Sequence, residues 1–202
     1  MYDNSVNMYS GEDCMNSELD ILKSECTSCN KCPLHTGRTN MVFGVGNPQA
    51  KIMFVGEGPG EQEDLQGEPF VGKSGQLLDK YLSLIDLDRK ENIYIANIVK
   101  CRPPMNRDPK PEEQDICIEY LRQQVKLIKP RIIVCLGRIA AQKLISPDFR
   151  VTAQHGEFME KGGILFMGTF HPSALLRQES NKPLALEDFQ KLRDKIKEEN
   201  LI

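Results

Sequence analysis

The sequence of 202 residues predicts an α/β fold, in which a parallel sheet is covered by helices on both faces. Short apolar runs of strand length alternate along the chain with segments whose apolar residues recur at helical spacing. Several of these runs end in glycine or in polar residues, as buried strands do at the carboxyl edge of such a sheet. No internal repeat or low-complexity stretch divides the chain, so we expect one domain over residues 17–202.

The expected elements follow in order. Residues 1–16 have no periodicity and are expected to form a flexible tail, and Ser17 then begins a short helix. We expect strands at 51–56, 93–99, 131–136 and, more weakly, 164–167, and helices near 74–85, 111–128, 138–145 and 184–199. Pro111 in the first turn and Pro130 after the last delimit the longest of these helices. Residues 170–177 are expected to form a loop.

Composition limits the class of protein. The net charge of −3 argues against a wholly basic nucleic-acid binder but permits a local basic groove. No apolar run approaches the ~20 residues of a membrane span, and the N-terminus has no signal-peptide pattern. Seven cysteines, an odd number, favour metal binding with spare thiols over a disulfide framework. We therefore expect a cytoplasmic protein.

Three cysteines, Cys26, Cys29 and Cys32, follow the first helix with two residues between each pair. This spacing lets two thiolates hold one metal centre from a single turn, but it leaves the metal open. Zinc would normally add a second close pair of ligands, and a ferredoxin run would place a fourth cysteine three residues on. Neither is present.

Other cysteines lie far downstream. Cys101 follows the strand at 93–99, and Cys117 lies on the inward face of the helix at 111–128. Both are candidate partners for the first cluster, although Cys117 is also explained as a small core residue. Cys135 lies within an apolar strand and is expected to belong to the core.

The stretch from Gly56 to Gly75 carries the greatest concentration of chemistry in the chain. It follows a buried strand, and its glycines permit a flat or anionic ligand to approach the backbone closely. The carboxylates of Glu57 and Glu63 lie in it together with the aromatic ring of Phe70. The alternative is an acidic surface loop with a stray phenylalanine.

Two further loops leave the same predicted sheet edge, where ligands bind in open α/β sheets. The loop at 97–107 is basic and suits phosphate groups, unless it is an ordinary solvated loop. In the loop at 170–177, His171 precedes Pro172, which favours an extended backbone at that histidine. A lone histidine is more often structural than catalytic, but this one shares an edge with the acidic loop.

Taken together, these loops and cysteines resemble the family 4 uracil-DNA glycosylases, the iron–sulfur branch of that superfamily. The resemblance covers roughly residues 18–195. The matching motifs are Cys29-x2-Cys32-Pro-Leu, Arg38-Thr39, Gly56-Glu57-Gly58-Pro59-Gly60, Glu63-Asp64, Pro69-Phe70-Val71-Gly72, Asn97-x-Val99-Lys100-Cys101-Arg102-Pro103-Pro104, Asn106-Arg107, Cys117, Leu136-Gly137-Arg138 and His171-Pro172-Ser173-Ala174-Leu175-Leu176-Arg177. As a set they are highly specific.

The resemblance implies a three-layer sandwich built on a four-stranded parallel sheet. It implies a structural [4Fe-4S] cluster on Cys29, Cys32, Cys101 and Cys117, which leaves Cys26 free. It further implies a monofunctional enzyme that hydrolyses the N-glycosidic bond of deoxyuridine. Its partner would be uracil-containing DNA, single- or double-stranded, bound by a monomer.

The resemblance also implies roles for individual residues. Phe70 would stack on the flipped uracil beside Gly58, Asn97 would read its Watson–Crick edge, and His171 would hydrogen-bond O2. Glu57 and Glu63 would lie in the loop that activates water. The residues expected to contact DNA are Lys100, Arg102, Arg107, Ser173, Leu175 and Arg177.

Two departures and two alternatives accompany this interpretation. Gly58 stands where the family usually has alanine, which could loosen the loop. The basic insert and the glutamine of the covalent uracil-binding branch are absent, which favours turnover. A non-catalytic nucleic-acid binding module would explain the basic loop and Phe70 but not Glu57, Glu63 and His171. An iron–sulfur redox protein would explain only the cysteines.

Overall fold

The computed structural model describes residues 11–202 and has one six-stranded sheet, with strand order β1-β3-β2-β4-β6-β5. The strands are β1 Val45–Gly46, β2 Ile52–Gly56, β3 Ile93–Asn97, β4 Ile132–Leu136, β5 Phe158–Lys161 and β6 Ile164–Thr169. The four central strands are parallel, which confirms the predicted core of the sheet. The edge strands β1 and β5 pair antiparallel and were not predicted, because one has two residues and the other is mostly exposed.

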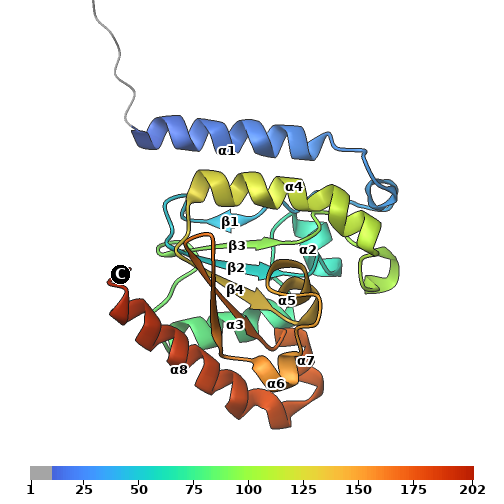
Figure 1. Cartoon of the computed structure of the whole chain (residues 1–202). Coiled ribbons are helices and arrows are strands. Elements are labelled where there is room, and N and C mark those ends of the chain that lie inside the picture. The colour runs from blue at the N-terminus through green and yellow to red at the C-terminus, as the bar shows by residue number, and fades with distance from the viewer. Residues whose placement is uncertain (1–10) are drawn as a thin grey trace, which may run out of the picture.

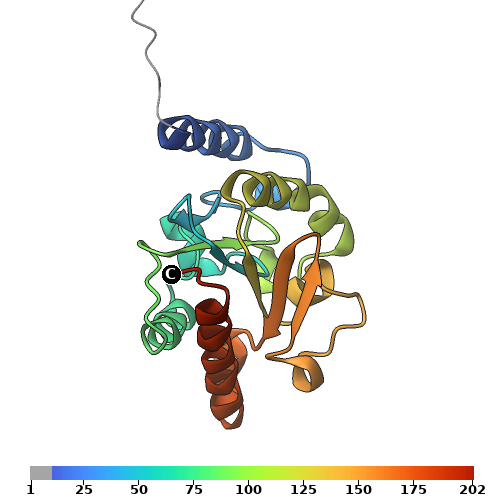
Figure 2. The same ribbon diagram turned by 60° about the vertical axis from the view of Figure 1, so that its left-hand side comes forward.

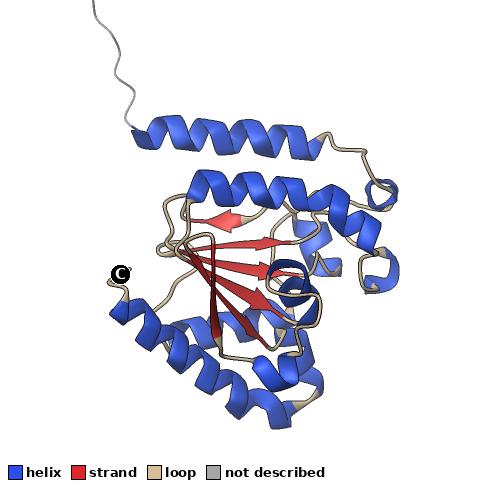
Figure 3. Cartoon of the chain, in the orientation of Figure 1, coloured by secondary structure: helices blue, strands red, loops and turns tan. Residues whose placement is uncertain are grey.

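Helices cover both faces of the sheet (Figures 1 and 3). The helices are α1 Gly11–Thr27, α2 Glu61–Gln66, α3 Lys73–Ser83, α4 Pro111–Ile128, α5 Arg138–Leu144, α6 Val151–Gln154, α7 Pro172–Arg177 and α8 Lys182–Glu198. One core cluster unites α4 and α5 with the sheet, and a second unites α3, α7 and α8 with the opposite face. Helix α1 lies on the outer side of α4 in both views (Figure 2). None of the described helices has the length and apolar character needed to cross a bilayer.

The central strands are buried on both faces, and this explains their continuous apolar sequences. Successive side chains of a strand point to opposite faces. In β2, Met53 and Val55 therefore join the core beneath α4, whereas Ile52 and Phe54 join the core beside α3 and α8. All four of these side chains are fully buried.

Three segments differ from the sequence-based expectation. Helix α1 begins at Gly11 rather than Ser17, so the predicted tail is wrong for 11–16, while 1–10 lie outside the described residues. The expected loop at 170–177 contains helix α7, since Pro172 occupies its first position and His171 caps it. Helix α2 forms within the acidic loop and ends at Gly67, which has a left-handed φ of 74°.

A buried polar network joins α8 to the end of β6. Asp188 of α8 is fully buried and accepts a hydrogen bond of 2.5 Å from Thr169 Oγ1. Its other oxygen lies 2.8 Å from His155 Nδ1, and the His155 ring packs on Phe170 at 4.8 Å between centroids. Thr169 and Phe170 immediately precede His171, so this network holds the strand end that carries the histidine.

We expect Asp188→Ala to lower the free energy of unfolding by about 3 kcal/mol, because Thr169 and His155 would lose a buried partner. Asp194→Ala is the matched control, since that carboxylate lies on the same helix with 69% of its side chain exposed. Its effect should stay below about 0.5 kcal/mol. Urea unfolding of both variants gives the comparison, and equal effects would contradict a structural role for Asp188.

Candidate active site

The carboxyl ends of the parallel strands surround one large cavity of about 910 Å³. The loops after β2, β3 and β6 all contribute to its lining, as expected for an open α/β sheet. Nine residues singled out from the sequence line it: Glu57, Gly58, Glu63, Phe70, Asn97, Arg107, His171, Ser173 and Arg177. The structure therefore brings together residues that are more than 100 positions apart in the chain.

Gly56, the last residue of β2, makes room for two side chains that line the cavity, Asn97 and Phe70. Gly56 lies directly opposite Asn97 in the parallel ladder. A Cβ atom at Gly56 would lie 2.5 Å from Asn97 Oδ1 and 2.6 Å from the Phe70 ring. Only a glycine therefore allows the aromatic ring and the amide to converge over this strand end.

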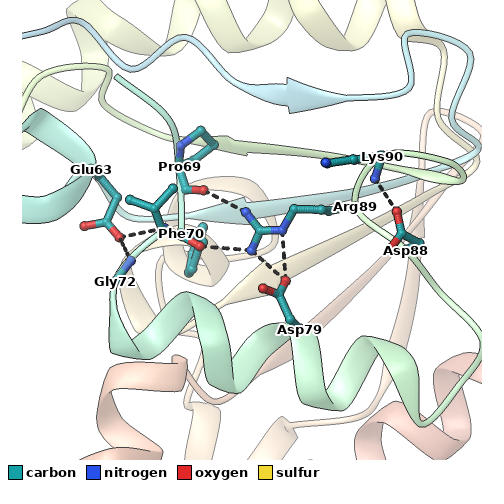
Figure 4. Close-up of polar contacts among 9 residues, drawn as sticks. Glu63, Pro69, Phe70, Gly72, Asp79, Asp88, Arg89 and Lys90 are labelled. Carbon is teal, nitrogen blue, oxygen red and sulfur yellow. Dashed lines mark hydrogen bonds and ion pairs between the residues drawn. The ribbon is translucent and has the colours of Figure 1, made fainter. Parts of the chain in front are cut away.

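The position of Phe70 is set by an arginine that lies outside the family motifs (Figure 4). Arg89 donates hydrogen bonds to the carbonyl oxygens of Pro69 at 3.2 Å and Phe70 at 2.9 Å. Asp79 of α3 holds the guanidinium at 2.6 Å. These bonds support the left-handed backbone of Phe70, which has a φ of 54°. Nothing in the local sequence around Phe70 signalled this clamp.

Glu63 is buried and serves the same loop (Figure 4). Its Oε1 accepts hydrogen bonds from the backbone N–H groups of Val71 at 3.0 Å and Gly72 at 2.9 Å. The catalytic role predicted for Glu63 stays a prediction, but these bonds indicate that the carboxylate positions the segment carrying Phe70. Asp64 acts similarly, accepting from Thr39 N at 3.0 Å.

Asn97 presents an unsatisfied acceptor to the cavity. Its side chain is 2% exposed, and within the described part of the chain Oδ1 has no hydrogen-bond partner. A buried carbonyl oxygen without a partner costs free energy, so it points to a ligand that supplies a donor. The backbone carbonyl of Asn97 is held by Lys100 Nζ at 3.1 Å.

His171 is held as a neutral hydrogen-bond donor. Its Nδ1 accepts from the backbone N–H of Ser173 at 3.1 Å, so the proton of a neutral ring resides on Nε2. Burial, reinforced by the charge of Arg177, lowers the pKa of His171 to about 4. The ring centroid lies 5.7 Å from that of Phe70. The imidazole thus carries an N–H beside the aromatic ring without carrying a charge.

Glu57 follows Gly56, and its pKa is shifted in the opposite direction to that of His171. Desolvation, with a contribution from the negative charge of Asp108, raises the pKa of Glu57 to about 7, although Arg138 opposes the shift. Asp108 and Arg138 form an ion pair of 2.5 Å, and both line the cavity. This pair joins the loop after β3 to α5, and its effect on Glu57 could not be anticipated because neither side chain belongs to the segment that carries Glu57.

The side chains of two residues expected to contact DNA, Lys100 and Leu175, are buried. Lys100 is 1% exposed and donates to Gln124 Oε1 at 2.6 Å, so its side chain joins the loop after β3 to α4 inside the protein. Leu175 is also 1% exposed, whereas its neighbour Leu176 is 42% exposed and lines the cavity. Arg107 lines the cavity and forms a bidentate salt bridge with Glu113. Arg102 is not among the residues that line the cavity.

Five cysteines line a second, smaller pocket: Cys26, Cys29, Cys32, Cys101 and Cys117. Cys101 Sγ lies 3.3 Å from Arg38 Nη1, and Cys117 Sγ accepts from the Lys100 backbone N–H at 3.3 Å. Among the described residues, no three His, Cys, Asp or Glu side chains are arranged so that they could hold a single metal ion. The thiolates of a cubane bind different irons and need not converge, so this donor set fits an iron–sulfur cluster. Cys135 lies outside the pocket.

Comparison with known proteins agrees with this geometry. Residues 43–197 match the model of the uracil DNA glycosylase superfamily. A type-4 uracil-DNA glycosylase of Thermotoga maritima is 44% identical over 95% of this chain and 100% of its own. Those of Archaeoglobus fulgidus and Sulfurisphaera tokodaii are 46% and 43% identical, over 86% and 87% of this chain and 91% and 84% of their own.

The chain belongs to the uracil DNA glycosylase superfamily. Within that superfamily, its similarity at 39–46% identity over most of the chain is to proteins named type-4 uracil-DNA glycosylases. The predicted family is therefore confirmed.

The environment of Glu57 gives a prediction that is independent of activity. In a carbon NMR titration, the Glu57 carboxyl should show a pKa of about 7. Asp108→Asn should lower that pKa, because a neighbouring negative charge disfavours ionisation, and Arg138→Gln should raise it. Asp115→Asn, outside the cavity, is the control. A Glu57 that titrates near the ordinary value of about 4.3 would contradict the assigned burial.

Proposed function

We propose that this chain is a type-4 uracil-DNA glycosylase acting on uracil-containing DNA, both single- and double-stranded. The enzyme hydrolyses the N-glycosidic bond of deoxyuridine, releases uracil and leaves an abasic site. The observation that carries the proposal is the buried Oδ1 of Asn97, which lies near the Phe70 ring and has no hydrogen-bond partner among the described residues. Such a site suits a flat base with an N–H donor on its edge.

Uracil matches this site in its hydrogen-bonding pattern. Its N3–H donates to Asn97 Oδ1, and its O4 accepts from the amide nitrogen, whereas cytosine presents the opposite pattern. Phe70 stacks on the flipped base. Gly58 also lines the cavity. Extruding the base costs a few kcal/mol, and these contacts offset part of that cost.

Bond cleavage is assisted from both sides of the glycosidic bond. The reaction passes through an oxocarbenium-like sugar, while negative charge gathers on the departing base. The Nε2–H of neutral His171 donates to O2 and stabilises that charge, for which a single donor contributes about 3 kcal/mol. Ionised Glu57 orients water and favours the positive sugar. No motif places a lysine as a Schiff-base nucleophile, so the reaction is monofunctional hydrolysis.

The rim of the cavity supplies the DNA contacts. Arg102, Arg107, Arg177 and Ser173 contact phosphates beside the extruded nucleotide. Leu176, which is exposed at the cavity, makes the DNA contact that the sequence analysis expected of Leu175.

The protein acts as a monomer, and residues 17–202 belong to one domain. A cytoplasmic location suits a thiol-bound cofactor, since that compartment keeps cysteines reduced.

Cys29, Cys32, Cys101 and Cys117 would hold a [4Fe-4S] cluster, as the match to the type-4 motif indicates. When bound, the cluster supplies a structural cross-link between the N-terminal segment, the loop after β3 and α4. The connection to the base pocket is short. Lys100 donates from its backbone to Cys117 and from its side chain to the Asn97 carbonyl, so the cluster loop and Asn97 are braced together.

We expect Asn97→Asp to reduce uracil excision by at least about 100-fold, because a carboxylate offers O4 no donor. The measurement is the single-turnover rate on a uracil-containing oligonucleotide, read on a gel after alkaline cleavage. Asn200→Asp, near the C-terminus, introduces the same charge at an exposed position and should leave the rate unchanged. Excision by Asn97→Asp at the normal rate would remove this residue from base recognition.

We expect the purified protein to be brown and to contain about four irons per chain. Cys101→Ala and Cys117→Ala should lose iron, while Cys26→Ala and Cys135→Ala should keep it. Iron analysis and visible absorbance give the result without reference to activity. Iron lost from Cys26→Ala but retained by Cys29→Ala would overturn the ligand assignment.

A further inference from the structure

One large apolar side chain stands almost entirely in solvent beside the active site. Met105 is 95% exposed, which is the highest value among the exposed large hydrophobic residues. Its backbone is left-handed, with φ 54° and ψ 24°, and the following Asn106 also has a φ of 54°. Two successive non-glycine residues in this region are uncommon and carry a cost in free energy. An exposed methionine with an unfavourable backbone conformation therefore calls for a functional explanation.

The loop that carries Met105 is firmly held. Arg102 Nε donates to Asn106 Oδ1 at 2.8 Å, and the Asn106 N–H donates to the Pro103 carbonyl at 3.0 Å. Arg107 forms two hydrogen bonds with the buried carboxylate of Glu113, at 2.7 and 2.8 Å. Pro103 and Pro104 restrict the backbone further. The loop therefore presents Met105 in a defined place.

That place is at the rim of the cavity, where the proposed function brings DNA. Pro103 and Asn106, on either side of the Met105 segment, line the cavity that receives the base. The loop follows β3, whereas Leu176 belongs to the segment after β6, at the other end of the parallel core. Two exposed apolar side chains thus stand on opposite flanks of the cavity. Two arginines, Arg102 and Arg107, flank Met105 with charges that suit phosphates.

We propose that Met105 inserts into the base stack of duplex DNA next to the extruded uracil and so favours excision from double strands. The inference rests on the proposed glycosylase function and concerns its preference between duplex and single-stranded DNA. Apolar side chains, methionine among them, act as wedges that unstack a base step. The flexible thioether adapts to steps of different sequence. A single strand has no duplex base stack to open, so Met105 should not affect the rate of excision from it.

The test compares single-turnover excision from one uracil-containing strand, alone and in a duplex with uracil opposite adenine. Met105→Ala should slow duplex excision about tenfold and leave single-strand excision unchanged, since only the duplex requires unstacking. Met105→Leu, which keeps an apolar side chain, should retain the duplex rate. Leu84→Ala is the matched control, because Leu84 is 60% exposed and lies just beyond the end of α3 that is remote from the cavity.

The outcomes separate the wedge from other roles. An equal loss on both substrates would show that Met105 supports the active site itself, and no loss on either would show that it does not enter DNA. Both results overturn the proposal. Single-strand excision by the wild type tests the proposed glycosylase function separately. Fluorescence of 2-aminopurine beside a non-cleavable 2′-fluorodeoxyuridine gives a direct readout: binding should raise it with the wild type and much less with Met105→Ala.

Discussion

The active site depends on the in-register parallel pairing of β2 with β3. This pairing sets Gly56 opposite Asn97 and continues beyond the strands, where Ile98 N donates to the Gly56 carbonyl and Val99 N donates to the Glu57 carbonyl. A shift by one residue would turn the Asn97 side chain to the other face of the sheet. The Asn97 amide and the Glu57 loop are therefore positioned by the same backbone ladder.

Burial then shifts the pKa values of two groups that line the cavity in opposite directions. Desolvation disfavours whichever form of a side chain is charged. It raises the pKa of Glu57 to about 7 and lowers that of His171 to about 4. Near neutral pH the cavity thus holds an uncharged N–H donor together with a carboxylate that is close to its titration midpoint. One physical cause thus gives both groups the protonation states that their proposed roles, acid–base group for Glu57 and oxyanion donor for His171, require.

The interior polar groups connect the two pockets. Lys100 is fully buried, and desolvation lowers its pKa to about 8. A buried ammonium is costly unless it is well paired, and here Gln124 and the Asn97 carbonyl accept from it. Gln124 in turn donates to the Phe43 carbonyl at 3.0 Å. The cysteine pocket, the large cavity and the sheet are thereby linked through a short series of hydrogen bonds.

The sequence by itself determined the central strands, the long helices and the loops that carry Glu57, Phe70, Asn97 and His171. It could do so because the period of apolar residues reports burial within regular elements, and because strand ends of a parallel sheet share one edge. Tertiary structure alone decided the directions of side chains in loops and short helices, and the polar contacts between elements, because the spacing of apolar residues does not report either. It turned Lys100 inward to Gln124 and paired Arg89 with Asp79 and Asp108 with Arg138, because each of these contacts joins two separate elements or loops. It also buried Leu175 and exposed Leu176, because the expected loop after β6 contains helix α7.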